Sequence, residues 1–203
     1  MRVIERIVRD VEAYGRPVRR AEITAMCHPR TLDRAVARGS LTRLAPGLYA
    51  STSTARLPSM RIAAAAAWMP SRAHIAGGAA LHLWGIEGHL GETVSIGSAP
   101  PDSGPAPRGM RLWRSRALVR TDMVGGIRTA SVADAFIQWW CLRARPLTEG
   151  PALDILRDGG VNARHAQAAL ARHPRVPSRA LLTRLLHEFA DGVHSALEPS
   201  GAA

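Results

Sequence analysis

Glycine and proline residues divide the first 50 positions into short segments, and this punctuation limits what the start of the chain can form. Apolar residues between Val3 and Val11 recur with the period of an α-helix, and charged residues lie between them. Gly15 is suited to end this helix, and Pro17 prevents it from continuing. We therefore expect an amphipathic helix that stops before Gly15.

Two more helices and a hairpin are predicted before residue 51. The second helix covers residues 18–26. The third covers residues 29–38, because Pro29 suits a first helical position and Gly39 provides a left-handed end. Residues 41–44 and 48–50 form the strands of a β-hairpin, with Ala45-Pro46-Gly47 at its tip.

The order helix, helix, turn, helix, hairpin is that of a winged helix-turn-helix domain, in which the third helix enters the DNA major groove and the hairpin is the wing. Arg30, Arg34 and Arg38 are spaced four residues apart, so they share one outward face of the third helix. Asp33 lies near this face and weakens the interpretation. The alternative is a structural helical hairpin whose arginine face is only solvated.

The candidate DNA contacts follow from this geometry. Guanidinium groups bind phosphate bidentately and can also bind guanine O6 and N7 together. Thr31 is near the N-terminal end of the third helix, where base edges are usually reached. Arg43 projects from the wing toward the minor groove or the backbone, and arginines at the start of the second helix would neutralise phosphates. The predicted DNA-binding residues are Arg19, Arg20, Arg30, Thr31, Arg34, Arg38 and Arg43.

The charge of the chain supports a polyanionic partner. All 27 basic residues are arginine, and with 16 acidic residues the formal net charge is +11. A GC-rich genome explains the use of arginine in place of lysine, but it does not explain the excess. Residues 1–50 contain 10 arginines and 5 acids, so this quarter of the chain carries nearly half of the excess. Double-stranded DNA is the expected partner.

The remaining sequence predicts a second domain. Residues 51–58 are polar and turn-rich, so we expect a linker between a domain at 1–52 and a domain at 57–192, followed by a disordered tail at 193–203. Helices are predicted at 60–69, 75–84, 131–141, 152–157, 162–172 and 178–189, strands at 93–96 and 110–114, and a hairpin at 123–129. The fold class is therefore α+β: an N-terminal winged helix-turn-helix followed by a mixed α/β domain with a small sheet flanked by helices.

Several short motifs carry a family resemblance. Arg43 to Tyr49 is similar to an R-L-x-x-G-V-Y ending, with Leu48 in place of valine. Ala73 to Ile86 is similar to an S-H-x-S-A-A-x-L-x-G-L stretch, and Gly126 to Ala135 to a G-x-x-V-T-S-x-x-R-T-x-x-D block that lacks its arginine here. With Ala21-Glu22-Ile23 and Arg34 to Gly39, these segments resemble the AbiEi-type antitoxins of bacterial abortive-infection systems, over about residues 1–195.

The resemblance implies a transcriptional repressor that binds the operator of its own toxin operon, with a nucleotidyltransferase-type toxin as a further partner. A homodimer is compatible with this, since repressors commonly bind near-palindromic sites as dimers. Two alternatives stay open. The chain is a protein-interaction module that neutralises a toxin without binding DNA, or it is the non-catalytic part of a winged-helix nuclease fusion, since Ser195-Ala196-Leu197-Glu198 is similar to the S-x-L-E segment that precedes such a nuclease.

No catalytic residues, metal or cofactor are expected. Glu198 alone cannot hold a magnesium ion, and the further carboxylates and lysine of a metal-dependent nuclease are missing, so we do not expect an enzyme. Cys27 and Cys141 form no CxxC motif, which argues against a zinc finger and fits a reducing, cytoplasmic location. The apolar run from Ile62 to Met69 is far shorter than the roughly 20 residues that span a bilayer, so we expect no membrane partner.

Overall fold

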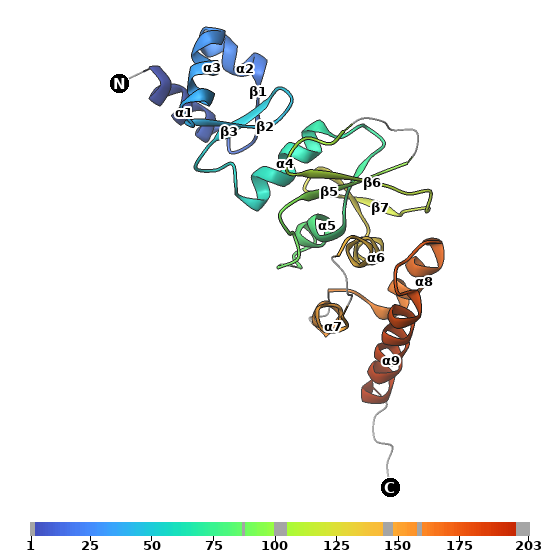
Figure 1. Cartoon of the computed structure of the whole chain (residues 1–203). Helices are drawn as coiled ribbons and strands as arrows, with labels where there is room; N and C mark the ends of the chain where they lie inside the picture. The colour runs from blue at the N-terminus through green and yellow to red at the C-terminus, as the bar shows by residue number, and fades with distance from the viewer. Residues whose placement is uncertain (1–2, 87, 100–104, 144–147, 158–159, 198–203) are drawn as a thin grey trace. The chain divides into compact units, whose positions relative to one another are not determined.

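The computed structural model describes residues 3–86, 88–99, 105–143, 148–157 and 160–197 (Figure 1). The chain folds into two compact units. The first unit contains residues 1–75 and 92–114, and the second contains residues 76–91 and 115–203. Helices and strands occur in both units, and the fold is α+β.

The first unit begins with an N-terminal module, which we define as residues 3–51. Its elements are α1 (Val3–Ala13), β1 (Val18–Arg19), α2 (Arg20–Met26), α3 (Pro29–Ala37), β2 (Leu41–Ala45) and β3 (Leu48–Ser51). The three strands form an antiparallel sheet in the order β1-β3-β2, and Figure 1 shows this module in blue. The three predicted helices and the hairpin are all present.

The start of the second helix differs from the prediction. Val18 and Arg19 form the short strand β1, which pairs with Tyr49 and Leu48 of β3, so the helix begins at Arg20 and not at Val18. Val18 is fully buried at this position. The backbone pairing and the burial of a β-branched side chain are supplied by β3, which is remote in sequence, and both override the local helical pattern.

A single apolar cluster holds the N-terminal module together. Buried side chains come from all three helices and all three strands: Ile7, Val11, Val18, Ile23, Leu32, Ala35, Leu41 and Tyr49. Burying one large aliphatic side chain contributes about 1.5–3 kcal/mol, so this cluster is the main source of stability for the module. It also fixes which face of α3 points outward.

The predicted linker is a hydrogen-bonded turn that leads into α4 (Pro58–Trp68). Ser51 Oγ lies 2.8 Å from the hydroxyls of both Ser53 and Thr54, and Ser53 donates to Glu12 at 2.5 Å. Beneath this turn, Ala50, Ala55 and Met60 form a second apolar cluster, against which Leu44 of β2 packs. The segment therefore fastens α4 to the hairpin.

The rest of the first unit contains strands β4 (His74–Ala76), β5 (Val94–Ser98) and β6 (Met110–Arg114), in the order β6-β5-β4. β5 and β6 are parallel, with Val94 opposite Met110 and Ser98 opposite Arg114. The helix predicted at 75–84 is shorter than expected, because its first residues belong to β4. Ile75 is β-branched and fully buried in β4, and the glycines at 77 and 78 weaken a helix there, so strand pairing decides the state of these first residues.

The second unit contains a short β-hairpin, which forms one edge of the sheet that also includes β4, and several helices. Its elements are α5 (Gly77–Leu83), β7 (Thr121–Val124), β8 (Ile127–Ala130), α6 (Val132–Leu142), α7 (Gly150–Arg157), α8 (Ala163–Arg172) and α9 (Arg179–Leu197). Gly125 and Gly126 have φ values of +56° and +78° and form the predicted β7–β8 turn. α6 lies at the centre, in contact with α5 and α8, and α8 packs against α9 (Figure 1).

The predicted tail begins too early. α9 continues to Leu197, so residues 193–197 are helical and not disordered. The helix is anchored by Leu182, Leu185 and Leu186, which are buried at helical spacing, and the sequence contains no proline between Arg179 and Leu197 that would end it. The remaining part of the predicted tail, residues 198–203, lies outside the described residues.

Candidate nucleic-acid interface

α3 is built so that one face is apolar and the other is cationic. His28 caps its start, since its Nδ1 accepts a hydrogen bond from the backbone N–H of Arg30 at 3.2 Å, and Pro29 occupies the first turn. Leu32 and Ala35 are fully buried in the module core. The opposite face therefore carries the arginine row, which we define as Arg30, Arg34 and Arg38, and all three side chains are exposed.

The arginine row keeps its positive charge. Within the part of the chain that the structure describes, none of its three guanidinium groups forms an ion pair. The nearby acid, Asp33, is instead paired with Arg20 of α2, whose Nη2 lies 3.5 Å from its Oδ1. The carboxylate that weakened the sequence interpretation is thus neutralised from the neighbouring helix.

A hollow of about 450 Å³ lies beside this face. It is lined by Thr31, Arg34, Arg38 and Ser40, and by residues 3–5 of α1. Thr31 is half-buried and lines the same hollow as two of the three arginines. The structure therefore brings Thr31, Arg34 and Arg38 together, as the sequence predicts.

The two arginines at the start of α2 have different surroundings. The Arg19 side chain is exposed, and its backbone N–H donates to Glu22 at 2.7 Å. Arg20 donates to the Tyr49 hydroxyl at 3.3 Å in addition to its pair with Asp33. Arg19 is therefore available to a phosphate, whereas Arg20 also links α2 to α3 and β3.

Glu22 has a role that sequence reasoning missed. Its carboxylate accepts two hydrogen bonds from Arg16, at 2.6 and 3.3 Å, and one from the backbone of Arg19. The Arg16 hydrogen bonds, followed by the Arg19 backbone bond, lower the pKa of Glu22 to about 2. The Glu22 carboxylate therefore stays ionised and caps the first turn of α2.

Arg43 is exposed on β2, but it does not line the hollow beside α3. It lines a separate hollow together with Arg56, Arg61 and Arg108. Sequence reasoning did not connect these four arginines, because they come from β2, the turn before α4, α4 and the segment before β6. No local pattern links positions so far apart.

The second unit contains a different polar centre, around the buried carboxylate of Asp134. Oδ2 accepts from Ser131 Oγ at 2.9 Å, from the backbone of Arg120 at 3.2 Å and from Arg172 Nη2 at 2.7 Å. Oδ1 accepts from His173 Nε2 at 3.0 Å. Burial by itself raises the pKa of Asp134, but the hydrogen bonds from His173, Arg172 and Ser131 outweigh it, and the pKa ends below its ordinary value of 3.8.

This centre contains serine, histidine and aspartate, but not in the arrangement of a hydrolase. In a catalytic triad the histidine bridges the serine and the acid, so that it can remove the serine proton. Here the carboxylate of Asp134 lies between Ser131 and His173, and it accepts from both. Ser131 also caps α6, since its Oγ accepts from the Asp134 backbone at 3.3 Å. The geometry serves folding and does not activate a nucleophile.

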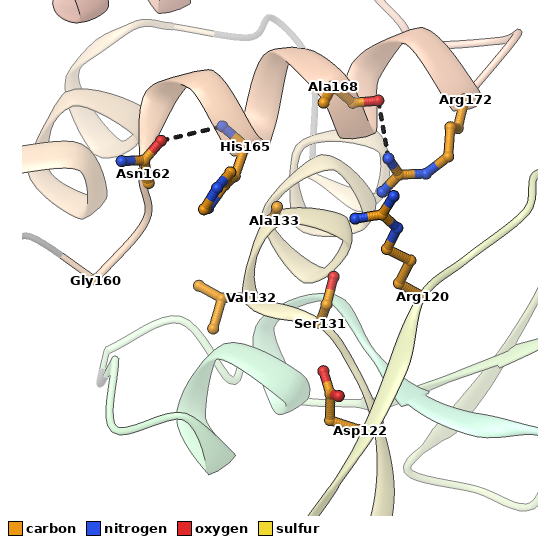
Figure 2. A pocket seen from close by; sticks show the side chains of 10 residues that line it. All are labelled: Arg120, Asp122, Ser131, Val132, Ala133, Gly160, Asn162, His165, Ala168 and Arg172. Carbon is orange, nitrogen blue, oxygen red and sulfur yellow. Dashed lines mark hydrogen bonds between the residues drawn. The ribbon is translucent and has the colours of Figure 1, made fainter.

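A hollow of about 550 Å³ lies next to this centre. Figure 2 shows the side chains that line it. Ser131 at the start of α6 lines it, together with Arg120, Asp122 and the α8 residues His165 and Arg172. Each nitrogen of the Arg172 guanidinium already donates a hydrogen bond, because Nε and Nη1 donate to the carbonyl oxygens of Leu118 and Ala168 at 3.2 and 3.0 Å. Ser131 and Arg172 of this hollow therefore help to hold the second unit together.

The described residues contain no group of three or more His, Cys, Asp or Glu side chains that could hold a metal ion. Among those same residues, none of the helices combines the length and the apolar character needed to cross a bilayer.

Comparison with known proteins gives a likeness in structure and none in sequence family. No family model matches the chain, and no curated protein matches it. The chain is similar to the crystal structure of the Rv2827c protein from Mycobacterium tuberculosis, with a TM-score of 0.57 and 16% sequence identity. The match covers 94% of this chain and 75% of that chain. At this identity the likeness shows the fold alone: an α+β architecture shared along nearly the whole chain.

Proposed function

We propose that this chain is a DNA-binding transcriptional repressor of the AbiEi antitoxin type, and that its N-terminal module is a winged helix-turn-helix. In this proposal α3 enters the major groove of operator DNA. The observation that carries it is the arginine row, which is exposed, is free of ion pairs within the described residues and is backed by the buried Leu32 and Ala35.

The chemistry of this face suits a duplex. The major groove is wide enough to admit an α-helix, and arginine is the side chain that most often binds guanine O6 and N7 bidentately. Thr31 in the first turn of α3 and Arg34 near its middle line one hollow, where a base edge would be read. Arg38 and Arg30 are at the two ends of the helix and would contact phosphates on either side of the groove.

Other groups would orient the module on the duplex. Arg43 of the β2–β3 hairpin would contact the minor groove or the backbone, as wings do, and Arg19 would contact a phosphate. Arg20 would hold α2 and α3 in register through Asp33, with its charge still near the backbone. These contacts fix position, while base contacts from α3 supply specificity.

The partner side of the proposal rests on the family resemblance. In a cytoplasmic antitoxin of this type, the second unit would support antitoxicity or assembly with a nucleotidyltransferase-type toxin. A protein that neutralised a toxin by contact alone would bind the toxin without preferring any DNA sequence. The two functions are separable, because one resides in α3 and the other does not.

A selection from random duplexes tests the DNA-binding function. We expect enrichment of one sequence, bound about 10³-fold or more tightly than random DNA at physiological salt. Arg34→Ala should weaken binding to that sequence by about 1–3 kcal/mol, because a base contact is lost. Arg157→Ala, an exposed arginine of α7 in the second unit, is the matched control and should change nothing. Failure to enrich any sequence would contradict the proposal.

A further inference from the structure

A second cationic surface lies in the first unit, away from α3. We define the basic hollow as the space of about 720 Å³ that is lined by Arg43, Arg56, Arg61 and Arg108. Small residues leave this space open, since Ala55, Ala64 and Gly109 also line it. Four arginines from four separate segments therefore converge on one depression.

The charge of the basic hollow is not balanced by its own lining. Among the described residues that line it there are four arginines and one acid, Glu92, so their formal charge is 4 − 1 = +3. Like charges around a concave surface repel one another and create a positive potential that draws anions in. An anionic ligand that bridges the guanidinium groups would relieve this repulsion.

Packing and backbone hydrogen bonds fix the chain segments that carry these arginines. Leu44, beside Arg43 in β2, packs against the cluster of Ala50, Ala55 and Met60, and this contact fixes the start of α4 near the hairpin. The segment that carries Arg108 turns at Gly109, which has a φ of +82°, and the Gly109 carbonyl accepts from the Val94 backbone at 2.9 Å. The hollow is therefore part of the folded unit.

The exposure of the arginines indicates an extended ligand. Arg43, Arg56 and Arg108 are exposed, and Arg61 is half-buried. A pocket for a small molecule buries most of its ligand and the groups that anchor it. A polyanionic backbone needs only to pass across open, positively charged side chains. Arg43 also connects the hollow to the hairpin, which carries the wing contact in the proposed function.

We propose that the basic hollow binds backbone phosphates of the same duplex that α3 reads, so that the DNA footprint extends from the hairpin to α4 and the segment before β6. This inference rests on the proposed function. The contacts are to phosphate, so they add affinity and salt dependence without adding sequence preference.

Titrations with a short and a long duplex test the inference. The short duplex contains only the sequence selected by the wild-type protein, and the long duplex adds about 10 base pairs of arbitrary sequence on each side, roughly one helical turn. The proteins are wild type, the double variant Arg56→Gln with Arg108→Gln, and the control double variant Arg157→Gln with Arg175→Gln. Both double variants lose two positive charges at exposed positions.

The expected result is specific to the long duplex. The hollow variant should bind it about 10- to 60-fold more weakly than wild type at 0.1 M salt, and its salt slope should fall by about 2, because two phosphate contacts release fewer counterions. Both double variants should bind the short duplex with wild-type affinity, apart from the equal small effect of lower net charge.

Three results would overturn the inference. One is equal affinity of the two double variants for the long duplex. Another is an equal loss on the short and long duplexes, which would confine the effect to the region contacted by α3. The third is that the hollow variant loses the ability to bind a free nucleoside triphosphate while its DNA affinity is unchanged, which would make the hollow a small-ligand site. In each case Arg34→Ala still tests the proposed function separately.

Discussion

Asp33 of α3 lies 3.5 Å from Arg20 of α2, measured between Oδ1 and Nη2. The same arginine donates to the Tyr49 hydroxyl of β3 at 3.3 Å, so Arg20 links both helices to the sheet. The pair also neutralises the acid that α3 carries next to the arginine row. The carboxylate of Asp33 would repel DNA phosphates, but its pair with Arg20 positions α3, the helix that is proposed to bind DNA.

Replacing Asp33 with Asn should raise DNA affinity modestly. The variant loses a negative charge that would lie near phosphates, and we expect an increase of about two- to fivefold at low salt that diminishes at high salt. Stability should change by less than about 1 kcal/mol, since both partners are exposed. Fluorescence anisotropy at two salt concentrations measures the first effect and urea unfolding the second.

Asp154→Asn provides the control for this charge change, because Asp154 is exposed on α7 in the second unit. It should leave DNA affinity almost unchanged. A weaker affinity of the Asp33 variant, with the control unaffected, would mean that the positioning of α3 by the Asp33–Arg20 pair outweighs the repulsion between the Asp33 carboxylate and phosphate.

The pKa of Glu22 provides a test of the α2 cap. The hydrogen bonds from Arg16, and then that from the Arg19 backbone, lower this pKa from 4.5 to about 2. Because the folded pKa is depressed, the cap contributes stability above pH 4.5 and loses this contribution as the pH falls from 4.5 to about 2.

Carboxyl resonances followed by NMR during an acid titration should show a midpoint for Glu22 near 2 in the wild type. Arg16→Gln should move the midpoint back toward 4.5, because the first cause of the shift is removed. An unchanged midpoint in the variant would show that Arg16 does not hold the carboxylate in solution.

How far the sequence predicts this fold depends on where each signal lies. The two ends of α3 and its outward face could be predicted, because Pro29, Gly39 and the four-residue spacing of its arginines are all local, whereas the His28 cap was not predicted. β1 and β4 could not, since a strand of two or three residues exists only through its partners. The end of α9 was placed too early, although residues 193–197 continue its helix.

The sites follow the same rule. Ser131 is recognisable as a cap from sequence. Arg172 and His173 also bind Asp134, but they are 38 and 39 residues away from Asp134 along the chain. Similarly, the basic hollow collects arginines from positions 43 to 108. Such groups are assembled by tertiary packing, and a single sequence carries no periodic signal for them.

The Asp134 centre should dominate the stability of the second unit. In Asp134→Asn the side chain of Arg172 loses a buried ionic partner, and we expect a loss of about 3–5 kcal/mol at neutral pH. The pKa of Asp134 is depressed in the folded state, so the advantage of wild type over the variant should be complete above pH 3.8 and shrink below it.

Urea unfolding followed by tryptophan fluorescence, at neutral pH and at about pH 3, measures this difference. Asp122→Asn is the control, since Asp122 is exposed and close to the same hollow, and it should cost less than about 1 kcal/mol. An equally small effect at Asp134 would mean that the Asp134 hydrogen bonds contribute little to folding.

Gly78 in α5 should not tolerate a side chain. A Cβ atom there would lie 1.7 Å from the backbone oxygen of His89, so Gly78→Ala forces one of the two backbone segments to move. We expect destabilisation of more than about 2 kcal/mol, or failure to fold. Gly150→Ala, where a Cβ would meet nothing within 4 Å, should be neutral or slightly stabilising in thermal unfolding.

If Gly78→Ala proved as stable as wild type, the approach of residue 89 to α5 would have to be looser than described. The two alanine variants share the same chemical change, so a difference between them isolates the steric contact. Circular dichroism at 222 nm provides the readout for both proteins.

The arginine row is proposed to read operator DNA. The triple variant Arg30→Gln, Arg34→Gln, Arg38→Gln is the direct test of this role. The measurement is its affinity for the selected duplex relative to random DNA, with circular dichroism to establish that the module stays folded. The preference for the selected sequence should disappear, because all three exposed guanidinium groups of the arginine row are removed. A folded triple variant that binds the selected duplex as tightly and as selectively as wild type would contradict this role.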